Sequence, residues 1–417
     1  MHAEIISIGA ELMTGSSIDT NSAWLSEQLT RLGVPTLRHA TVGDDAAAIA
    51  AAMGESASRA ALVLVTGGLG PTRDDLTRAG LAAALGVPLV HDPDSMAQID
   101  AFFRALNRPM PQANRVQADV PAGATVLPND WGTAPGIRAC LGDATIFCMP
   151  GVPREMKAMF DRYVTPFVAE SGPARGMATR VLRTFGAGES TLAEQIADLM
   201  TPGRNPAVGT TASEGVISVR IVASGATPTD AQQLADADEA EVRRRLGVLV
   251  YGHGDDTLAS VVGGLLADRS LTLATAESCT GGLIAKFLTD VPGASHYLAG
   301  GVVTYSNALK TQLLGVPETL LAERGAVSAE VAETMAEQCR QRLGTDLALS
   351  VTGVAGPDGG TADKPVGLVY IALATPAGTQ TKECHFSDRL DRAAIRDRTA
   401  KTALNLLRHH LLNSPST

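Results

Sequence analysis

Two adjacent residues with nucleophilic side chains, Ser278 and Cys279, lie in the segment TAESCTGGLIA (275–285). A cysteine is intrinsically the better nucleophile once a nearby base or cation makes its thiolate, whereas a serine needs a base within direct reach. Successive side chains of an extended segment point in opposite directions, so only one of the two faces a cleft. A glycine pair and a helix-like run follow, and the free N–H groups at the start of that helix would bind an oxyanion.

The base for this nucleophile is sought among the nearby histidine and lysine residues. His296 follows VPGAS (291–295) in a predicted loop, which favours a surface or structural role. Lys310 directly follows the run VVTYSNAL, and a desolvated lysine beside a serine can take the hydroxyl proton. Ser–Lys pairs are an accepted variant of the catalytic triad. Tyr305 ends the same predicted strand and is placed to relay that proton or to donate to the oxyanion.

A glycine-rich loop with two carboxylates follows a predicted strand in VTGGLGPTRDDLT (65–77). Its glycines allow backbone N–H groups to approach an anion, and the aspartates suit a divalent cation held against a pyrophosphate. These residues are Gly67, Gly68, Gly70, Asp74 and Asp75. The loop is neither a Walker A motif nor a dinucleotide fingerprint. Because GAELMTG (9–15) and VGDD (42–45) also end predicted strands in glycine and carboxylates, we expect one acidic crevice that needs a cation to take a phosphate.

The composition is typical of a layered α/β protein, with 45% hydrophobic, 19% charged and 4% aromatic residues. At roughly 150 residues per domain, 417 residues predict two to three domains. The formal charge of −10 argues against direct nucleic-acid binding. Five cysteines without a C-x-x-C pair indicate neither a disulfide framework nor a zinc site. Without a leader-like start or an apolar run of about 18 residues, we expect a soluble cytoplasmic protein that binds no membrane.

The elements that must position these residues alternate between strands and helices in the N-terminal part. Strands are predicted at 4–9, 61–70 and within 144–156, and a helix at 19–33. Asp19 or Asn21 would cap this helix and Gly33 would end it. The alternation predicts a parallel sheet with helices on both faces and a ligand site beyond the carboxyl ends of the strands.

The pattern changes after about residue 175. Residues 175–250 read as β-α-β-β-α-β without the G-x-x-G loop of an RNA-binding KH domain, which favours a connecting or dimerising module. A linker is predicted at 252–256, and a second α/β domain follows it. Its elements are helices at 257–270, 281–290 and 388–412 and strands at 271–278, 300–306, 346–353 and 366–375. The tail 413–417 is expected to be disordered.

The N-terminal motifs resemble those of CinA proteins. The matching segments are IISIGAELMTG, DTNSAWL, TVGDD, VTGGLGPTRDDLTRAG, GTAPG and MPGVPREM. In that family this domain is similar to the molybdopterin-binding fold of MoaB and MogA, and it implies a metal-dependent ADP-ribose pyrophosphatase that makes AMP and ribose 5-phosphate. One departure is Ala10, where the family usually has the aspartate of G-D-E.

The resemblance assigns ligands to this N-terminal crevice. Substrate contacts are expected at Gly67, Gly68, Gly70, Thr72 and Asn21. Metal ligands are expected at Glu11, Asp44, Asp74 and Asp75. The implied cofactors are a divalent cation (Mg²⁺, Mn²⁺ or Co²⁺) and K⁺.

The opening motif belongs to a second resemblance. Together with GGVVTYSNALK, VTGVAGPDGGT and KPVGLVY, it closely resembles the C-terminal nicotinamide mononucleotide deamidase domain of CinA proteins. The resemblance implies Ser278 as nucleophile, assisted by Tyr305 and Lys310, with no cofactor. Substrate contacts are expected at Thr280, Gly281, Gly282, Thr352 and Arg392. Arg389 and Arg396 lie close to the position matched by Arg392.

These observations predict two separate α/β domains joined by a small α+β, KH-like module. The expected boundaries are 1–172 for the molybdopterin-binding-like domain, 173–251 for the connector and 252–417 for the deamidase domain. The expected protein is a homodimeric, bifunctional enzyme of pyridine-nucleotide recycling. The alternatives are a molybdopterin-related N-terminal enzyme and a non-catalytic competence or damage-response protein that acts through partners.

Overall fold

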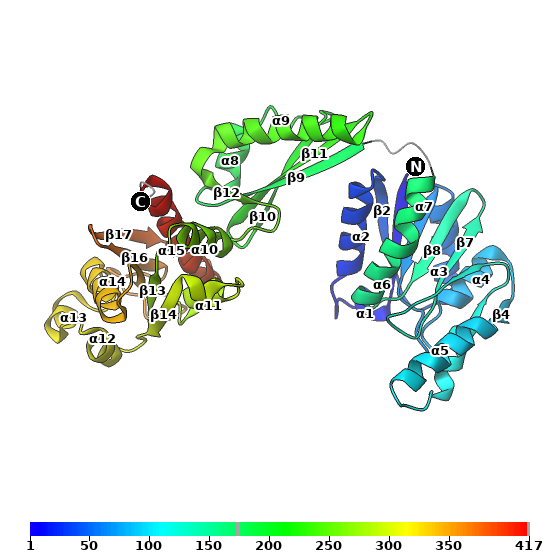
Figure 1. Ribbon diagram of the computed structural model, residues 1–417, viewed down its shortest axis with the longest axis horizontal. Coiled ribbons are helices and arrows are strands. Elements are labelled where there is room, and N and C mark those ends of the chain that lie inside the picture. Colours follow the sequence, from blue (N-terminus) through cyan, green and yellow to red (C-terminus); the bar gives the residue numbers. More distant parts are fainter. Residues whose placement is uncertain (172–175, 415–417) are drawn as a thin grey trace. The chain divides into compact units, whose positions relative to one another are not determined.

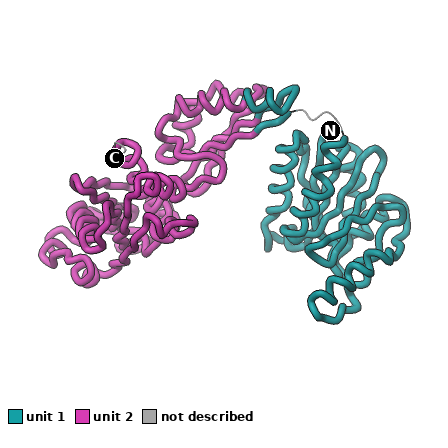
Figure 2. The backbone as a smooth tube through the Cα atoms, in the orientation of Figure 1, with its two compact units in different colours: residues 1–178, 223–234 teal, residues 179–222, 235–417 magenta. Residues whose placement is uncertain are grey.

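The computed structural model describes residues 1–171 and 176–414. The chain forms two compact units, residues 1–178 with 223–234 and residues 179–222 with 235–417 (Figure 2). The predicted domain boundary at 172 and 173 lies outside the described residues, as does most of the tail predicted to be disordered. Its first residue, Asn413, ends the last helix.

The first unit contains a six-stranded sheet in the order β2-β1-β3-β8-β7-β6 (Figure 1). Its strands are β1 (Ala3–Ile8), β2 (Thr36–Val42), β3 (Leu62–Thr66), β6 (Thr125–Leu127), β7 (Gly136–Leu141) and β8 (Ala144–Met149). The first four in the sheet are parallel, as predicted, whereas β7 and β6 are antiparallel. The prediction of a purely parallel sheet was therefore wrong, because the hairpin of β7 and β8 needs no helical crossover.

Alternate residues of the central strands serve two cores, so helices cover both faces of this sheet (Figure 1). Ile5 and Leu64 pack under α2, while Ile6 and Val65 pack under α3. The helices are α1 (Ala10–Met13), α2 (Thr20–Arg31), α3 (Ala46–Ala57), α4 (Thr77–Leu85), α5 (Pro93–Ala105), α6 (Pro153–Met159) and α7 (Thr165–Glu170), and β4 (Leu89–His91) pairs with β5 (Asp119–Pro121). Asp19, one of the two predicted caps, accepts a hydrogen bond from the Ser22 N–H at 2.9 Å.

The middle module has the predicted β-α-β-β-α-β order. Its elements are β9 (Gly176–Thr184), α8 (Glu189–Gln195), β10 (Ala207–Ser213), β11 (Val216–Gly225), α9 (Pro228–Leu246) and β12 (Val250–His253), and its sheet has the order β10-β11-β9-β12. The predicted linker at 252–256 was wrong at its start, because Gly252 and His253 complete β12, which pairs with β9.

The C-terminal domain contains a five-stranded sheet in the order β14-β13-β15-β16-β17. Its strands are β13 (Leu273–Glu277), β14 (Leu298–Val303), β15 (Leu347–Gly353), β16 (Leu368–Thr375) and β17 (Gly378–His385). β13 lies between two parallel neighbours, so its carboxyl end is the central one of three. The antiparallel strand β17 was not predicted, because its side chains are mostly exposed and show no apolar run.

Helices cover both faces of this second sheet. They are α10 (Leu258–Asp268), α11 (Leu283–Thr289), α12 (Asn307–Leu314), α13 (Glu318–Arg324), α14 (Ala329–Leu343) and α15 (Arg392–Asn413). α10, α11 and α15 share one core, and α14 packs on the other face. The last helix begins at Arg392 rather than at 388, because the Asp391 carboxylate caps it by accepting the Ala394 N–H.

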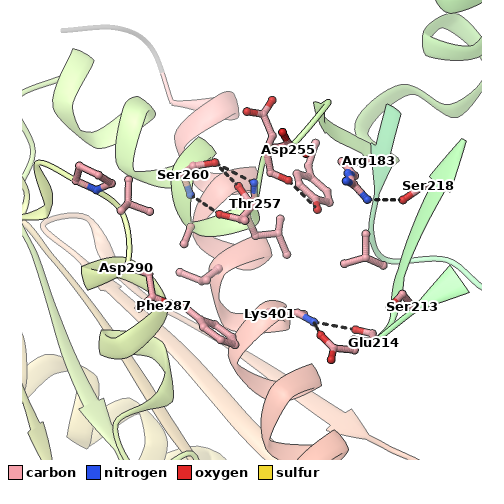
Figure 3. A pocket seen from close by; sticks show the side chains of 18 residues that line it. Arg183, Ser213, Glu214, Ser218, Asp255, Thr257, Ser260, Phe287, Asp290 and Lys401 are labelled. Carbon is pink, nitrogen blue, oxygen red and sulfur yellow. Dashed lines mark hydrogen bonds and ion pairs between the residues drawn. The ribbon is translucent and has the colours of Figure 1, made fainter. Parts of the chain in front are cut away.

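The middle module and the C-terminal domain share a hydrophobic core. Phe185 and Tyr251 of the module pack among the buried residues of α10, α11 and α15. The buried Arg408 of α15 donates to the carbonyl oxygens of Val248 and Val250. Figure 3 shows a further contact between them, in which Lys401 of α15 reaches Glu214. These contacts fasten the module to the domain that carries Ser278.

Candidate active site

Ser278 and Lys310 are in direct contact in the buried interior of the C-terminal domain. The Lys310 ammonium donates to Ser278 Oγ at 3.0 Å and to the Thr304 carbonyl oxygen at 2.8 Å. Ser306 caps α12, and this places Lys310 one turn into the helix, close to the end of β14. Lys310 is only 1% exposed, and burial lowers its pKa because a desolvated ammonium is destabilised. Lys310 is therefore a base in direct reach of a serine hydroxyl.

Cys279 points the other way. Its side chain is 6% exposed and belongs to the core under α11 and α15. Burial raises the pKa of its thiol to about 12, so the thiolate is disfavoured. The expected reason for this separation was wrong: β13 ends at Glu277, and the chain turns at Ser278 and Cys279 instead of remaining extended.

The turn after Ser278 depends on two glycines and on a buried carboxylate. Gly281 and Gly282 have φ values of 61° and 93°, which only glycine adopts easily. The Glu277 carboxylate accepts the N–H groups of Gly282, Ile284 and Ala285 at 3.0, 3.1 and 2.9 Å. Glu277 therefore occupies the start of α11, where we expected an oxyanion to bind.

Two other N–H groups remain for an oxyanion. Across residues 1–171 and 176–414, no acceptor lies within hydrogen-bond distance of the N–H groups of Cys279 and Thr280. Both belong to the turn that begins with the nucleophile. Glu277 was missed by the sequence reasoning, although its place directly before the nucleophile on a buried strand was an available signal.

Two arginines from the first turns of α15 complete this region. Arg392 donates to the Gly356 carbonyl at 2.7 Å and to the Tyr305 hydroxyl at 2.6 Å. Arg396, one turn later, donates to the Thr280 carbonyl at 2.6 Å and so holds the turn of the nucleophile. Tyr305 is 58% exposed and lies two residues beyond the end of β14, not at the end of the strand as predicted.

Unpaired buried polar atoms gather around the same turn. Six side-chain atoms of the described residues are buried without a hydrogen-bond partner, and four of them belong to Thr275, Thr280, Thr304 and Arg396. Buried polar groups are normally paired, so such a group marks a place where a ligand or water completes the bonding. Thr352 differs, since its hydroxyl already donates to the Ala326 carbonyl at 2.7 Å.

The N-terminal crevice lies beyond the carboxyl ends of β1, β2, β3 and β8. It is a cavity of about 410 Å³, and seven of the predicted site residues line it: Glu11, Asp44, Gly67, Gly68, Gly70, Asp74 and Asp75. Thr72 and Asn21 are not among its lining residues. Asn21 instead ties two loops together, because its side-chain amide donates to the Gly151 carbonyl at 2.8 Å and to the Thr66 hydroxyl at 3.1 Å.

The carboxylates of this crevice bond to the chain's own groups. Asp44 accepts the N–H of Ala10 at 2.8 Å, and Asp75 accepts both the N–H and the hydroxyl of Thr72. A hydrogen bond from the Thr72 hydroxyl also lowers the pKa of Asp74. In the part of the chain that the structure describes, no three His, Cys, Asp or Glu side chains lie together as a metal-binding group.

Three further residues line the crevice and were not predicted: Gln117, Thr133 and Glu155. Glu155 accepts a hydrogen bond from the Asn129 side chain at 2.7 Å. A Cβ at Gly132 would lie 2.1 Å from this carboxylate, so the loop of Gly132 needs glycine there. Glu155 stands in the quoted motif MPGVPREM, so a signal for it existed, whereas no pattern points to Gln117.

Comparison with known families gives three matches in chain order. Residues 4–170 match the probable molybdopterin binding domain, residues 179–252 the damage-inducible protein CinA KH domain, and residues 255–411 the CinA C-terminal domain. A CinA-like protein of Parasynechococcus marenigrum is 48% identical over 411 residues, which cover 98% of each chain. A putative competence-damage inducible protein of Symbiobacterium thermophilum is 44% identical, with 99% of each chain covered.

The chain belongs to the CinA family.

Solved structures of CinA proteins match the C-terminal or N-terminal part alone. The competence/damage inducible protein CihA of Agrobacterium tumefaciens is 42% identical, covers 36% of this chain and 92% of its own, and gives a TM-score of 0.36. The CinA membership confirms the predicted family and the α/β fold class with a KH-like middle module. A search of the described helices found none long and apolar enough to cross a membrane.

Proposed function

We propose that the C-terminal domain of this CinA protein hydrolyses the carboxamide of nicotinamide mononucleotide to nicotinic acid mononucleotide and ammonia. The observation that carries this proposal is the buried 3.0 Å contact between Lys310 Nζ and Ser278 Oγ. A lysine with a lowered pKa next to a serine hydroxyl suits acyl transfer, in which a covalent ester replaces one difficult step by two easier ones.

The proposed reaction begins with neutral Lys310. It takes the Ser278 proton while Oγ attacks the carboxamide carbon, and the carbonyl oxygen becomes an oxyanion. The N–H groups of Cys279 and Thr280 bind this oxyanion. Lys310 then passes the proton to the departing nitrogen, ammonia leaves and the acyl-enzyme forms. Water activated by the same lysine adds to the ester, which releases the carboxylate product and restores the Ser278 hydroxyl.

We assign the nucleotide phosphate to the outer part of this site. Arg392 is exposed at the start of α15, and its guanidinium already forms two parallel donations, to Gly356 and to Tyr305. The planar fork of a guanidinium suits bidentate phosphate binding. Tyr305 holds that fork and adds a hydroxyl donor. Gly281, Gly282 and Thr280 surround the reacting carboxamide in this proposal.

The test is ammonia release from nicotinamide mononucleotide by the full-length protein and two variants. Ser278→Ala should lose activity by about 10³-fold or more, because the acyl-enzyme cannot form. Cys279→Ala should retain most activity and serves as the matched control. If the cysteine variant alone is inactive, the nucleophile is wrong; if well-folded wild type releases no ammonia, the deamidase proposal fails.

For the N-terminal domain we propose metal-dependent cleavage of ADP-ribose to AMP and ribose 5-phosphate. Carboxylate oxygens suit Mg²⁺, Mn²⁺ or Co²⁺, and Mg²⁺ is usually held by one or two carboxylates plus phosphate oxygens. The crevice offers such carboxylates at Glu11, Asp44, Asp74 and Asp75, separated rather than clustered, which fits a cation that arrives with the diphosphate. The bound cation would neutralise the diphosphate charge, and K⁺ would assist.

In this proposal the chain's own groups orient the substrate. The N–H groups of the loop at Gly67, Gly68 and Gly70 face the diphosphate, and Thr72 keeps Asp75 in place. The match to the probable molybdopterin binding domain favours a second candidate, an enzyme that acts on molybdopterin. Assays of the purified protein against both compounds separate the two, since turnover of ADP-ribose alone excludes molybdopterin chemistry.

We further propose that the protein acts as a homodimer on small nucleotides, without direct nucleic-acid contact. The formal charge of −10 supports the second part, because a phosphate backbone would be repelled. The non-catalytic alternative, a competence or damage-response protein acting through partners, predicts that neither substrate is turned over.

A further inference from the structure

A second large cavity lies where the middle module meets the C-terminal domain. Its volume is about 700 Å³, and it is lined by the loop after β9, the turn after β10, the strand β17 and one side of α15. None of the residues assigned above to the deamidase or to the ADP-ribose site lines it. A cavity of this volume accommodates a molecule as large as a nucleotide.

Two positively charged side chains line this cavity without a protein partner. Arg398 is partly buried, yet within residues 1–171 and 176–414 its guanidinium forms no hydrogen bond or ion pair. Lys382 of β17 is exposed and likewise forms none there. A partly buried guanidinium without an acceptor is costly to desolvate, so an anionic ligand would stabilise it.

A neutral donor supplements these charges. The Asn405 side-chain oxygen accepts a hydrogen bond from Arg408 at 3.0 Å, which fixes the orientation of this amide. Its NH₂ end is then left facing the loop at Gly186, 3.7 Å from where a Cβ of that glycine would lie. Among the described residues this NH₂ group has no acceptor.

The carboxylates of the cavity are, in contrast, already engaged. Glu214 pairs with Lys401 at 3.5 Å, Glu189 accepts from the Thr210 hydroxyl at 3.0 Å, and Glu383 accepts from His385 at 2.6 Å. The unsatisfied groups of this cavity are therefore donors, with Arg398 and Lys382 carrying positive charge.

The neighbouring cavity in Figure 3, of about 620 Å³, makes the opposite case. Its two basic side chains are satisfied: Arg183 donates to Ser218 and to the Gly254 carbonyl, and Lys401 pairs with Glu214 and Asp397. The two cavities border the same module and the same helix, but only the first offers unpaired cationic donors.

We propose that the cavity bordered by Arg398, Lys382 and Asn405 binds a phosphate-bearing small molecule. The guanidinium takes two phosphate oxygens, the ammonium a third, and the Asn405 amide donates to the phosphate or to its ester oxygen. Arg398 lies two residues after Arg396, about 200° further around α15 at roughly 100° per residue, so this site is on another side of the helix from the Ser278 turn.

Hydrogen–deuterium exchange of the full-length protein tests this proposal, because it reports each site separately from the two nucleotide sites. The probes are inorganic phosphate and AMP, with adenosine as the uncharged comparison. We expect phosphate or AMP to slow exchange in peptides covering residues 185–190 and 380–386, and adenosine to have no effect there. Protection by AMP alone means that the site needs a nucleotide, and protection by both means that the phosphate group suffices.

The variants decide whether the named side chains bind the probe. Arg398→Ala combined with Lys382→Ala should raise the half-protecting probe concentration by at least about tenfold, because two charge-assisted contacts are lost. Asn405→Asp, a milder change, should also weaken protection because it places a carboxylate beside the anion. Arg244→Ala, which removes an exposed ion pair on α9, should leave protection unchanged. Absence of protection in the wild type, equal protection by adenosine, or unchanged protection in both site variants would overturn the proposal.

Discussion

The Ser278 region and the N-terminal crevice differ in what their polar side chains already touch. Around Ser278, the groups proposed to react are in contact with each other, as Lys310 Nζ lies 3.0 Å from Ser278 Oγ. In the crevice, each carboxylate with a hydrogen bond receives it from the local loop, as Asp44 does from the Ala10 N–H. The described residues there form no cluster of metal-binding side chains.

This difference shows how two kinds of site are prepared by a fold. A serine and a lysine can react only if they are held together before the substrate arrives, so burial and helix capping must place them. A cation with phosphate oxygens brings much of its own coordination, so the fold needs only to offer separated oxygen ligands and free N–H groups. The first site should therefore be more sensitive to single substitutions than the second.

Lys310→Met breaks the comparison most severely. Methionine fills the same buried space without a base, so ammonia release should fall by about 10³-fold or more while ADP-ribose cleavage persists. Lys286→Met, which removes an exposed lysine paired with Asp290, is the matched control and should change neither activity. Loss of both activities in the Lys310 variant would indicate a folding defect and contradict the assignment of the base.

The same substitution makes a prediction about stability and pH. The pKa of Lys310 is lowered in the folded protein by burial, so between this pKa and the ordinary lysine pKa the unfolded chain binds one more proton. The free energy of unfolding should therefore rise with pH through that window, and Lys310→Met should remove this rise. Urea unfolding at a series of alkaline pH values measures it, and an unchanged slope in the variant would mean that Lys310 is not the group responsible.

Glu277→Ala should have the next largest effect. It leaves three N–H groups at the start of α11 without their acceptor, so the free energy of unfolding should fall by about 2–3 kcal/mol. Because the turn of Ser278 is then less well held, kcat should fall by roughly 10²-fold with little change in KM.

Glu277→Gln separates positioning from general destabilisation. An amide oxygen still accepts hydrogen bonds, so this variant should recover much of the stability and part of kcat. Glu337→Ala, which removes an exposed carboxylate bonded only to the Thr379 hydroxyl, serves as the control. If both Glu277 variants keep full kcat, Glu277 does not position the nucleophile.

The sequence predicted the elements that carry apolar periodicity better than it predicted the contacts between them. The strands ending at Thr66 and Glu277 are continuous buried runs, and these were found correctly. β17 was missed because its face is exposed, and the helices between residues 307 and 343 were not assigned. The bond from Arg396 to Thr280 joins residues 116 positions apart, and such a contact depends on the tertiary fold alone.

The site motifs show the same limit at finer scale. The pair of Ser278 and Lys310 could be proposed from residue chemistry and family resemblance, because both lie in recognisable segments. The role of Glu277 at the start of α11 could not, because it depends on a turn built from Gly281 and Gly282. In the crevice, the glycines and aspartates were found from their motifs, but the engagement of Asp44 by Ala10 follows only from the folded geometry.

The smallest expected effect concerns Ala10 and sharpens the comparison from the other side. Ala10 begins α1, and its N–H already bonds to Asp44, so Ala10→Asp places a further carboxylate at the mouth of the crevice. If the crevice lacks only oxygen ligands, the cation concentration for half-maximal ADP-ribose cleavage should fall about tenfold, with deamidase activity unchanged. Titration of Mg²⁺ or Mn²⁺ in the AMP-release assay measures this, with Ala101→Asp on the exposed face of α5 as the control. A variant that needs as much cation as the wild type would mean that this position does not limit cation binding, and the contrast between a prearranged and a ligand-completed site would then rest on the substrate alone.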